Sequence, residues 1–161
     1  MAWDIRAATP RDAAAMARLY HDTIRRVNVR DYAPGQIVAW AGAGPDPAKW
    51  EARLATRRTF VACRGGDVLG FAELAAGGHV DAVYVHHAHQ GQGIASRLLA
   101  RIEQEAALRG VDRLYVEASI TARPFFERRG FTVVKAQDVA RRGVVFRNYR
   151  MEKRRDAAKP A

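Results

Sequence analysis

The chain has 161 residues, 48% of them hydrophobic, and a formal net charge of +10 from 27 Lys and Arg against 17 Asp and Glu. This length predicts one domain with its own core, and no apolar run approaches the roughly 20 residues that a membrane-spanning helix needs. Cys63 is the single cysteine, which excludes an internal disulfide, and the first residues form no apolar signal segment, so we expect a cytoplasmic protein without membrane contact.

The first half of the chain alternates between strand and helix patterns. Thr9 followed by Pro10 is typical of a helix start, with a capping side chain and a proline in the first turn. The segment over 31–47 is rich in Gly and Pro and reads as irregular. The expected elements are a strand over 3–7, a helix from 9 to beyond 24, a short helix over 36–41, a helix over 46–56, and strands over 59–64 and 68–75.

The second half begins at the Gly77-Gly78 turn, which leads into an apolar strand. Thr121 is the expected cap of a short helix that Gly130 ends. The expected elements are a strand over 79–86, a long helix over 93–109, a strand over 113–118, the helix after 121, and a closing hairpin of 131–136 with 144–151. We expect one domain over 1–155 and a disordered tail over 156–161.

The positive charge would suit nucleic acid or another polyanion. The basic residues are scattered, however, and short groups such as Arg128-Arg129 and Arg141-Arg142 do not alternate with aromatic residues. We therefore expect no nucleic-acid partner, and a nucleic-acid-associated protein is the weaker of two alternative functions.

Residues 83–95 carry the most informative pattern: an apolar strand, a glycine loop and an immediate helix start. The first amides of a helix lack internal partners, and the helix dipole is positive there, so this arrangement binds anions, pyrophosphate above all. Gly91 and Gly93 would let the backbone turn tightly and approach a ligand. A Walker loop is excluded because Ile94, not Lys, follows Gly93, and the dinucleotide fingerprint is only partly met.

The loop Gln90-Gly91-Gln92-Gly93-Ile94-Ala95 resembles the acyl-CoA loop of the GNAT superfamily of N-acyltransferases, with Gln90, Gly93 and Ala95 at its fixed places. The downstream segment from Ala118 to Phe131, which ends in Gly130-Phe131, resembles the strand-to-helix segment of the same superfamily. Two matches at the expected separation support the resemblance more strongly than one short glycine pattern.

The resemblance implies an α/β (α+β) fold: a mixed central sheet of about 6–7 strands, with a splay between two parallel strands and flanking helices. Here these strands are 79–86 and 113–118, and the pantetheine arm of acetyl-CoA would pair along the first like an added strand. Acetyl-CoA is the expected co-substrate, and no metal is expected. The implied cofactor-binding residues are Val83, Tyr84, Val85, Gln90, Gly91, Gln92, Gly93, Ile94, Ala95, Ser96, Ser119 and Phe126.

The resemblance also shows a departure. Many members place a Tyr, the acid for the thiolate, where this chain has Phe126, so that role does not carry over. Ser119 stands where many members have an Asn that contacts the cofactor arm, and a hydroxyl can form a similar hydrogen bond. Tyr115 and Tyr149 are possible substitute acids.

A general base is needed because an amine must lose a proton before it attacks. By the period of two, His79, Asp81, Val83 and Val85 should share one strand face. Glu73 and Asp81 are our leading candidates for the base, with His79 third. In the alternative interpretation, Glu73 is a solvated edge residue and Asp81 only pairs with an Arg.

The histidines at 86, 87 and 89 crowd together. Neighbouring residues of a strand point to opposite faces, so we expect His86 and His87 not to share a metal ion.

The predicted function is an N-acetyltransferase that moves an acetyl group from acetyl-CoA to a primary amine by direct transfer. The first alternative is a non-catalytic acyl-CoA-binding module, which the missing Tyr favours. The partner would be a small-molecule or peptide amine, and a homodimer stays open. Since binding residues concentrate on loops, candidates for acceptor contacts are His21, Tyr32, Gln36, Trp40 and Trp50.

Overall fold

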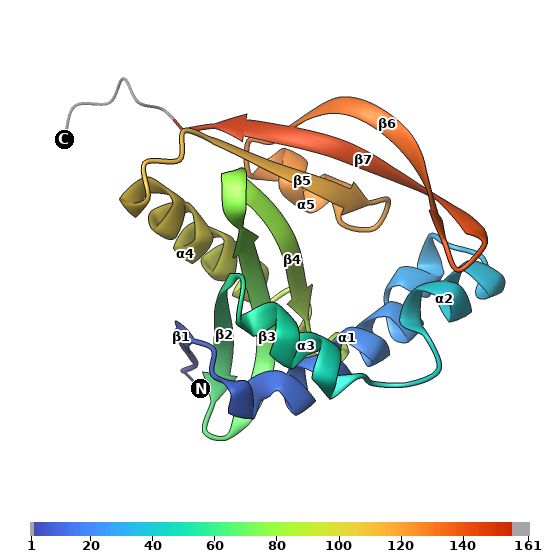
Figure 1. Cartoon of the computed structure of the whole chain (residues 1–161), viewed down its shortest axis with the longest axis horizontal. Helices are drawn as coiled ribbons and strands as arrows, with labels where there is room; N and C mark the ends of the chain where they lie inside the picture. Colours follow the sequence, from blue (N-terminus) through green and yellow to red (C-terminus); the bar gives the residue numbers. More distant parts are fainter. Residues whose placement is uncertain (1, 156–161) are drawn as a thin grey trace.

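A seven-stranded sheet forms the centre of the computed structural model, which describes residues 2–155 (Figure 1). The strand order is β1-β2-β3-β4-β5-β7-β6. The strands are β1 (Asp4–Ala7), β2 (Arg58–Arg64), β3 (Asp67–Ala75), β4 (His79–Val85), β5 (Arg113–Ser119), β6 (Thr132–Arg141) and β7 (Val144–Arg154).

All neighbouring strands are antiparallel except β4 and β5, which run parallel and pair only at His79↔Tyr115 and Val80↔Val116. Beyond these residues the two strands diverge, as Figure 1 shows. Directly before β4, Gly78 has a φ of +87°, and a Cβ there would lie 2.2 Å from the carbonyl oxygen of Arg113. The predicted mixed sheet with a splay between two parallel strands is confirmed.

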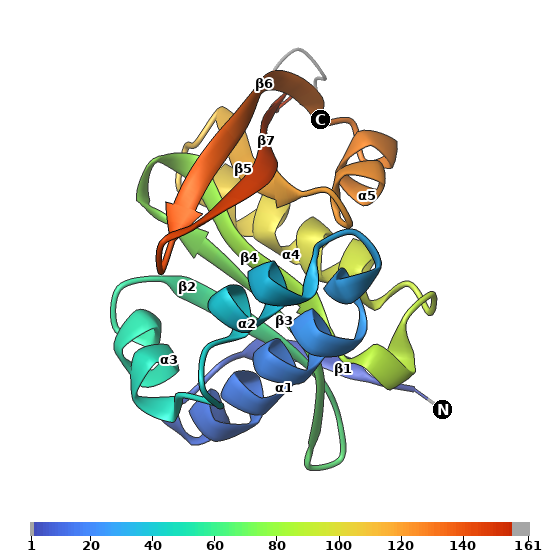
Figure 2. The ribbon, with the colours of Figure 1, turned by 90° about the vertical axis from the view of Figure 1, so that its right-hand side faces the viewer.

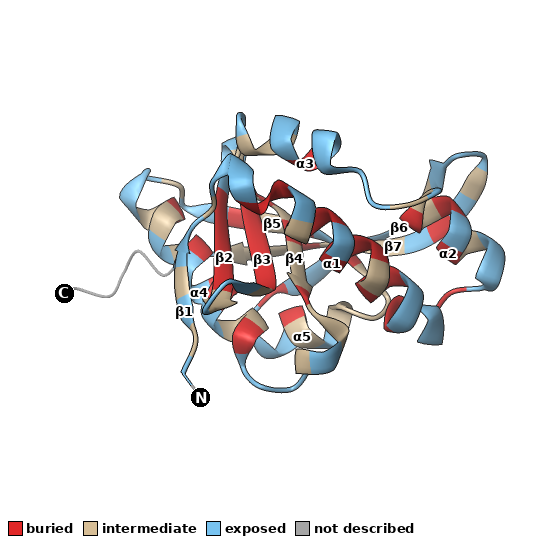
Figure 3. Cartoon of the chain, turned by 90° about the horizontal axis from the view of Figure 1, so that it is seen from below, coloured by how far each residue is buried: buried red, intermediate tan, exposed pale blue. Residues whose placement is uncertain are grey.

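Five α-helices cover the two faces of the sheet (Figures 2 and 3). One face, here called the α4 face, packs against α4 and α5, and its core includes Leu98, Ile102 and Phe126. The other, here called the α1 face, packs against α1, α2 and α3, with Met16, Ile24 and Trp50 in its core. The helices are α1 (Ala13–Arg26), α2 (Pro34–Ala41), α3 (Pro47–Leu54), α4 (Ile94–Leu108) and α5 (Arg123–Arg128).

A β-bulge in β4 changes which side chains share a face. The register with β3 shifts from Glu73↔Ala82 to Leu74↔Val80, so Asp81 is an extra residue. Val83 and Val85 belong to the core of the α4 face, whereas Asp81 contacts arginines on the α1 side. The expectation that Asp81 shares a face with Val83 and Val85 was therefore wrong, because a bulge interrupts the period of two.

Several predicted boundaries also change. Residues 10–12 form a 3₁₀ turn before α1, β4 ends at Val85, and β6 and β7 extend well beyond the predicted hairpin. The first amide of the turn into α5, at Ala122, donates to the Ser119 hydroxyl at 3.0 Å, so the predicted cap at Thr121 was wrong. The predicted tail over 156–161 lies outside the described residues. Between residues 2 and 155, no helix is long and apolar enough to span a membrane.

Candidate functional site

The loop between β4 and α4 is held in shape from within. His86 Nδ1 accepts a hydrogen bond from the amide of Ala88 at 3.0 Å, and Gln90 Nε2 donates to the carbonyl of Val85 at 2.7 Å. Gly91 and Gly93 have φ values of 73° and 82°, a region that L-residues with side chains rarely adopt. The structure thus uses the Gln90 side chain to fix the loop, and the two glycines to turn it.

Gly93 is the N-cap of α4, so the amides of the first helical turn have no partner within the helix. Ile94 is 1% exposed, so its side chain anchors this turn in the core. The guanidinium of Arg129, which follows α5, donates to the hydroxyl of Ser96. Sequence reasoning missed Arg129; it adds a positive charge where a pyrophosphate would bind.

Where β4 and β5 diverge, a gap opens between them, and the backbone of β4 faces this gap at alternate residues. His86 N donates to Leu69 O in the ladder with β3, whereas Val85 O accepts from Gln90 and from Thr23 Oγ1 at 3.2 Å. By the alternation of an antiparallel ladder, the backbone groups of Val83 also point toward the gap, and those of Tyr84 point toward β3. Val83 is therefore the residue best placed to pair with an added strand.

Ser119 and Phe126 lie near the far side of the gap. The Ser119 hydroxyl already accepts a hydrogen bond from the amide of Ala122 in the turn into α5. Phe126 is 3% exposed and packs edge-to-face on Phe125 and Phe131, with ring centroids 5.1 and 5.2 Å away. Tyr149 also packs against this core, with the Arg123 guanidinium 4.4 Å from its ring.

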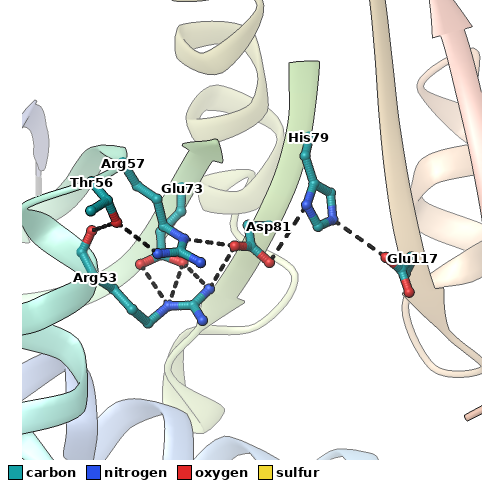
Figure 4. A network of polar contacts seen from close by, with 7 residues as sticks. All are labelled: Arg53, Thr56, Arg57, Glu73, His79, Asp81 and Glu117. Atoms are coloured by element: carbon teal, nitrogen blue, oxygen red, sulfur yellow. Dashed lines mark hydrogen bonds and ion pairs between the residues drawn. The ribbon is translucent and has the colours of Figure 1, made fainter. Parts of the chain in front are cut away.

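A cluster of charged side chains occupies the α1 face beside the bulge (Figure 4). Glu73 is completely buried, and Arg53 binds its carboxylate through Nη2 and Nε at 2.5 and 3.0 Å. Asp81 Oδ2 accepts from Arg57 Nε at 2.7 Å and lies 3.0 Å from Arg53 Nη2. We call this group, with His79 and Glu117, the polar cluster. Glu73 is therefore no solvated edge residue, whereas Asp81 does pair with arginine.

The two carboxylates have opposite electrostatic environments. Burial raises the pKa of Glu73, and the hydrogen bonds and charge of Arg53 only partly oppose it. Burial also acts to raise the pKa of Asp81, but the hydrogen bond from Arg57 and the charge of Arg53 outweigh it, so that pKa is lowered. Asp81 is consequently a weak proton acceptor, and Glu73 is enclosed by its partner.

His79 lies between two carboxylates, and no arginine of the described residues forms a hydrogen bond with its ring. Its Nδ1 is 3.9 Å from Asp81 Oδ1, its Nε2 is 3.8 Å from Glu117 Oε1, and its ring stacks on Tyr115 with centroids 4.6 Å apart. His79 and Tyr115 form one of the two residue pairs that join β4 to β5. The imidazole is thus next to the closed end of the gap.

Sequence reasoning brought Glu73, Asp81 and His79 together correctly but missed Arg53, Arg57 and Glu117. Arg53 lies in the last turn of α3, and Arg57 lies three residues beyond the end of α3, directly before β2. Two arginines at this spacing are common on solvated segments. Only tertiary packing brings Arg53 to the buried Glu73 and Arg57 to Asp81, so no local signal identifies these two arginines.

We expect Arg53→Met to lower the free energy of unfolding by about 3 kcal/mol, because it leaves the buried Glu73 carboxylate unpaired. Urea denaturation would measure this loss, and the double variant Arg53→Met/Glu73→Leu should recover most of it. Arg57→Met is the matched control, since Asp81 is 19% exposed and keeps Arg53. Equal losses in Arg53→Met and Arg57→Met would contradict the assigned role of the buried pair.

The histidines after β4 lie close together. The rings of His86 and His87 stack with centroids 4.3 Å apart, because β4 has already ended and His87 begins a 3₁₀ turn. The expected opposite orientation was therefore wrong. In the described part of the chain, no group of three or more His, Cys, Asp or Glu side chains is arranged to hold a metal ion.

Most of the residues expected to contact the acceptor have structural roles instead. Trp50 is 2% exposed. His21 Nδ1 lies 3.2 Å from Ala41 O, and Gln36 Nε2 donates to Val145 O at 2.9 Å. Tyr32 Oη donates to Arg147 O at 2.8 Å and accepts from Ile120 N at 2.9 Å, which links the segment before α2 to both β5 and β7. Trp40 is half-buried over the same region.

Comparisons with known proteins agree with this geometry. A family model for the acetyltransferase (GNAT) domain matches residues 28–153. The chain is 33% identical over 147 residues to the uncharacterized N-acetyltransferase YafP of Escherichia coli K12, covering 91% of this chain and 93% of that protein. A GCN5-related N-acetyltransferase from Rhodopseudomonas palustris has a TM-score of 0.89 and 34% identity, with 94% of each chain covered. The structure of yncA from Salmonella typhimurium with its cofactor acetyl-CoA has a TM-score of 0.72 and 26% identity, covering 100% and 99%.

Proposed function

Because the chain belongs to the GNAT family of acetyltransferases, we propose that it transfers the acetyl group of acetyl-CoA directly to a primary amine. The observation that carries this proposal is the gap between β4 and β5, which opens beside the free amides of α4 and closes beside the polar cluster. Bound acetyl-CoA supplies an activated acetyl thioester. The chain supplies binding, orientation and proton transfer.

Binding is assigned to backbone groups on two elements. The amides at the start of α4, over 93–96, are free to bind the pyrophosphate, with Arg129 nearby. Val83 directs its backbone toward the gap and is proposed to pair with the pantetheine arm. A Cβ at Gly91 or Gly93 would meet no atom within 4 Å, so the loop surface is open to a ligand.

Proton transfer is assigned to the polar cluster. Arg53 binds the Glu73 carboxylate, and Arg57 binds Asp81 Oδ2. His79 is therefore the proposed acceptor of the amine proton. Asp81 Oδ1 faces His79 Nδ1 and would orient the ring, while Glu73 holds Arg53. A separation of 3.9 Å is compatible with this role, because catalytic hydrogen bonds often tighten only when substrate binds. Tyr149, beside α5, is the proposed acid for the thiolate.

Free thiol release would test the function directly. Purified protein with acetyl-CoA and a panel of primary amines should give amine-dependent release of CoA, and calorimetry should show acetyl-CoA binding by the protein alone. Binding without release for any amine would favour a non-catalytic acyl-CoA-binding module, and absence of binding would refute the assigned site.

We expect Phe126→Ala to lower the free energy of unfolding by about 3–5 kcal/mol, because it opens a cavity in a packed aromatic core. Phe126→Tyr should remain folded. Phe125→Ala is the matched control; Phe125 is only partly buried, so its loss should be smaller. Thermal unfolding with and without acetyl-CoA would also show whether Phe126 supports the cofactor arm. An unchanged stability and cofactor affinity in Phe126→Ala would contradict both roles.

A further inference from the structure

Three cations have no role in the chemistry above: Lys49 on α3, and Arg141 and Arg142 at the turn between β6 and β7. Among the described residues, none of the three forms an ion pair within 4.0 Å, whereas Arg53 and Arg57 are neutralised by Glu73 and Asp81. All three residues are exposed, although Arg142 also donates to a backbone carbonyl and aromatic rings partly cover the Lys49 ammonium.

Lys49 lies against aromatic rings. Its ammonium is 4.6 Å from the ring centroid of Tyr20 and 5.2 Å from that of Trp50. Arg53, one helical turn further along α3, lies 5.0 Å from the same Trp50 ring and binds Asp81. Lys49 is therefore only one turn of α3 away from the polar cluster.

The turn between β6 and β7 is fixed over the same region. Arg142 donates to the carbonyl of Ala39 on α2. Phe146 of β7 packs against Trp40 and Tyr32, with each pair of centroids 6.0 Å apart. Figure 2 shows the tip of this hairpin reaching the side of the molecule where α2 and α3 lie.

These cations act on one another. Burial lowers the pKa of Lys49, and the positive charges of Arg53, Arg141 and Arg142 lower it further, with only Asp46 opposing them. Like charges held together destabilise the folded state, and a bound anion would offset that repulsion. The Tyr20 and Trp50 rings beneath the ammonium are buried, so they hold Lys49 in place at the surface.

We propose that the acceptor amine carries an anionic group, a carboxylate or a phosphate, that binds among Lys49, Arg141 and Arg142. Its amine would then face the polar cluster, where His79 is the proposed acceptor of its proton. This inference rests on the proposed function and names the substrate class of the same site.

The test compares amines in pairs that differ in the anion. Thiol release would be measured with phenylalanine against phenethylamine and with O-phosphoethanolamine against ethanolamine, with rates expressed per unprotonated amine. We expect kcat/KM to be at least about tenfold higher for the anionic member of one pair, and which pair responds distinguishes carboxylate from phosphate. The variant Lys49→Gln/Arg141→Gln should lose this preference and retain acetyl-CoA affinity, whereas Arg18→Gln, on the exposed side of α1, should keep it.

Equal use of both members in each pair would overturn the inference and leave the proposed function intact. A separate binding experiment tests the anion site even if no amine is acetylated and the proposed function fails. In the presence of CoA, calorimetry should show N-acetylphenylalanine binding more tightly than N-acetylphenethylamine, or O-phosphoethanolamine more tightly than ethanolamine, and the double variant should abolish the difference. No difference in either comparison would refute the anion site independently of turnover.

Discussion

Gly93→Val is expected to abolish measurable binding of CoA and acetyl-CoA while the protein remains folded. Gly93 has a φ of 82° at the N-cap of α4, and a valine there would move the backbone away from this left-handed conformation. The amides of residues 93–96 would then no longer converge on one anion. Isothermal calorimetry would measure the affinity, and circular dichroism would confirm that the fold persists.

Gly110→Val is the matched control for this experiment. Gly110 lies just beyond the other end of α4, has a φ of 71°, and a Cβ there would also meet nothing within 4 Å. Both variants should lose a similar amount of stability, about 1–2 kcal/mol, because both impose the same backbone strain. Only Gly93→Val should lose binding. An unchanged affinity in folded Gly93→Val would show that the pyrophosphate binds elsewhere.

Removal of the proton acceptor should have the largest effect on turnover. We expect His79→Asn to lower kcat/KM by roughly 10²–10⁴ at pH 7 without weakening acetyl-CoA binding, since an alkyl amine is mostly protonated at that pH. The loss should shrink as the pH rises, because more amine is then free without help from the protein. Steady-state thiol release across pH, with any accepted amine, would measure it.

Asp81→Asn should cause a smaller loss than His79→Asn, because Asp81 acts on the ring and not on the amine. His87→Asn controls for the removal of an imidazole near the loop. If His79→Asn kept a near-normal rate while Glu73→Gln or Asp81→Asn lost activity at pH 7, a carboxylate would be the base. If all three kept their rates, solvent would be the acceptor.

Much of the fold was predictable because its signals are local. The strand, glycine loop and helix start over 83–95 depend on residues within one short segment, and Gly91 and Gly93 do have the positive φ values that the loop requires. The resemblance of this loop and of the segment ending at Phe131 then implied the splay between β4 and β5, which the structure confirms.

The environment of the candidate site was not predictable because it depends on distant contacts. The bulge at Asp81 is visible only in the register with β3, and no residue type in β4 predicts it. Glu73 is buried on the internal strand β3, and its partner Arg53 comes from α3, 20 residues earlier in the chain. Alternation and propensity describe neighbours along a strand, so they could identify the side chains of the polar cluster but not their partners.

The sparse pairing of β4 with β5 has a mechanical consequence. The sheet consists of two blocks, β1 to β4 and β5 with β7 and β6. Within the sheet, two residue pairs and the close approach of Gly78 to Arg113 join the blocks. That approach leaves no room for a side chain at residue 78, so the junction of the blocks depends on this glycine. A ligand that pairs with β4 inside the gap would bridge the two blocks, so we expect cofactor binding to make this junction more rigid.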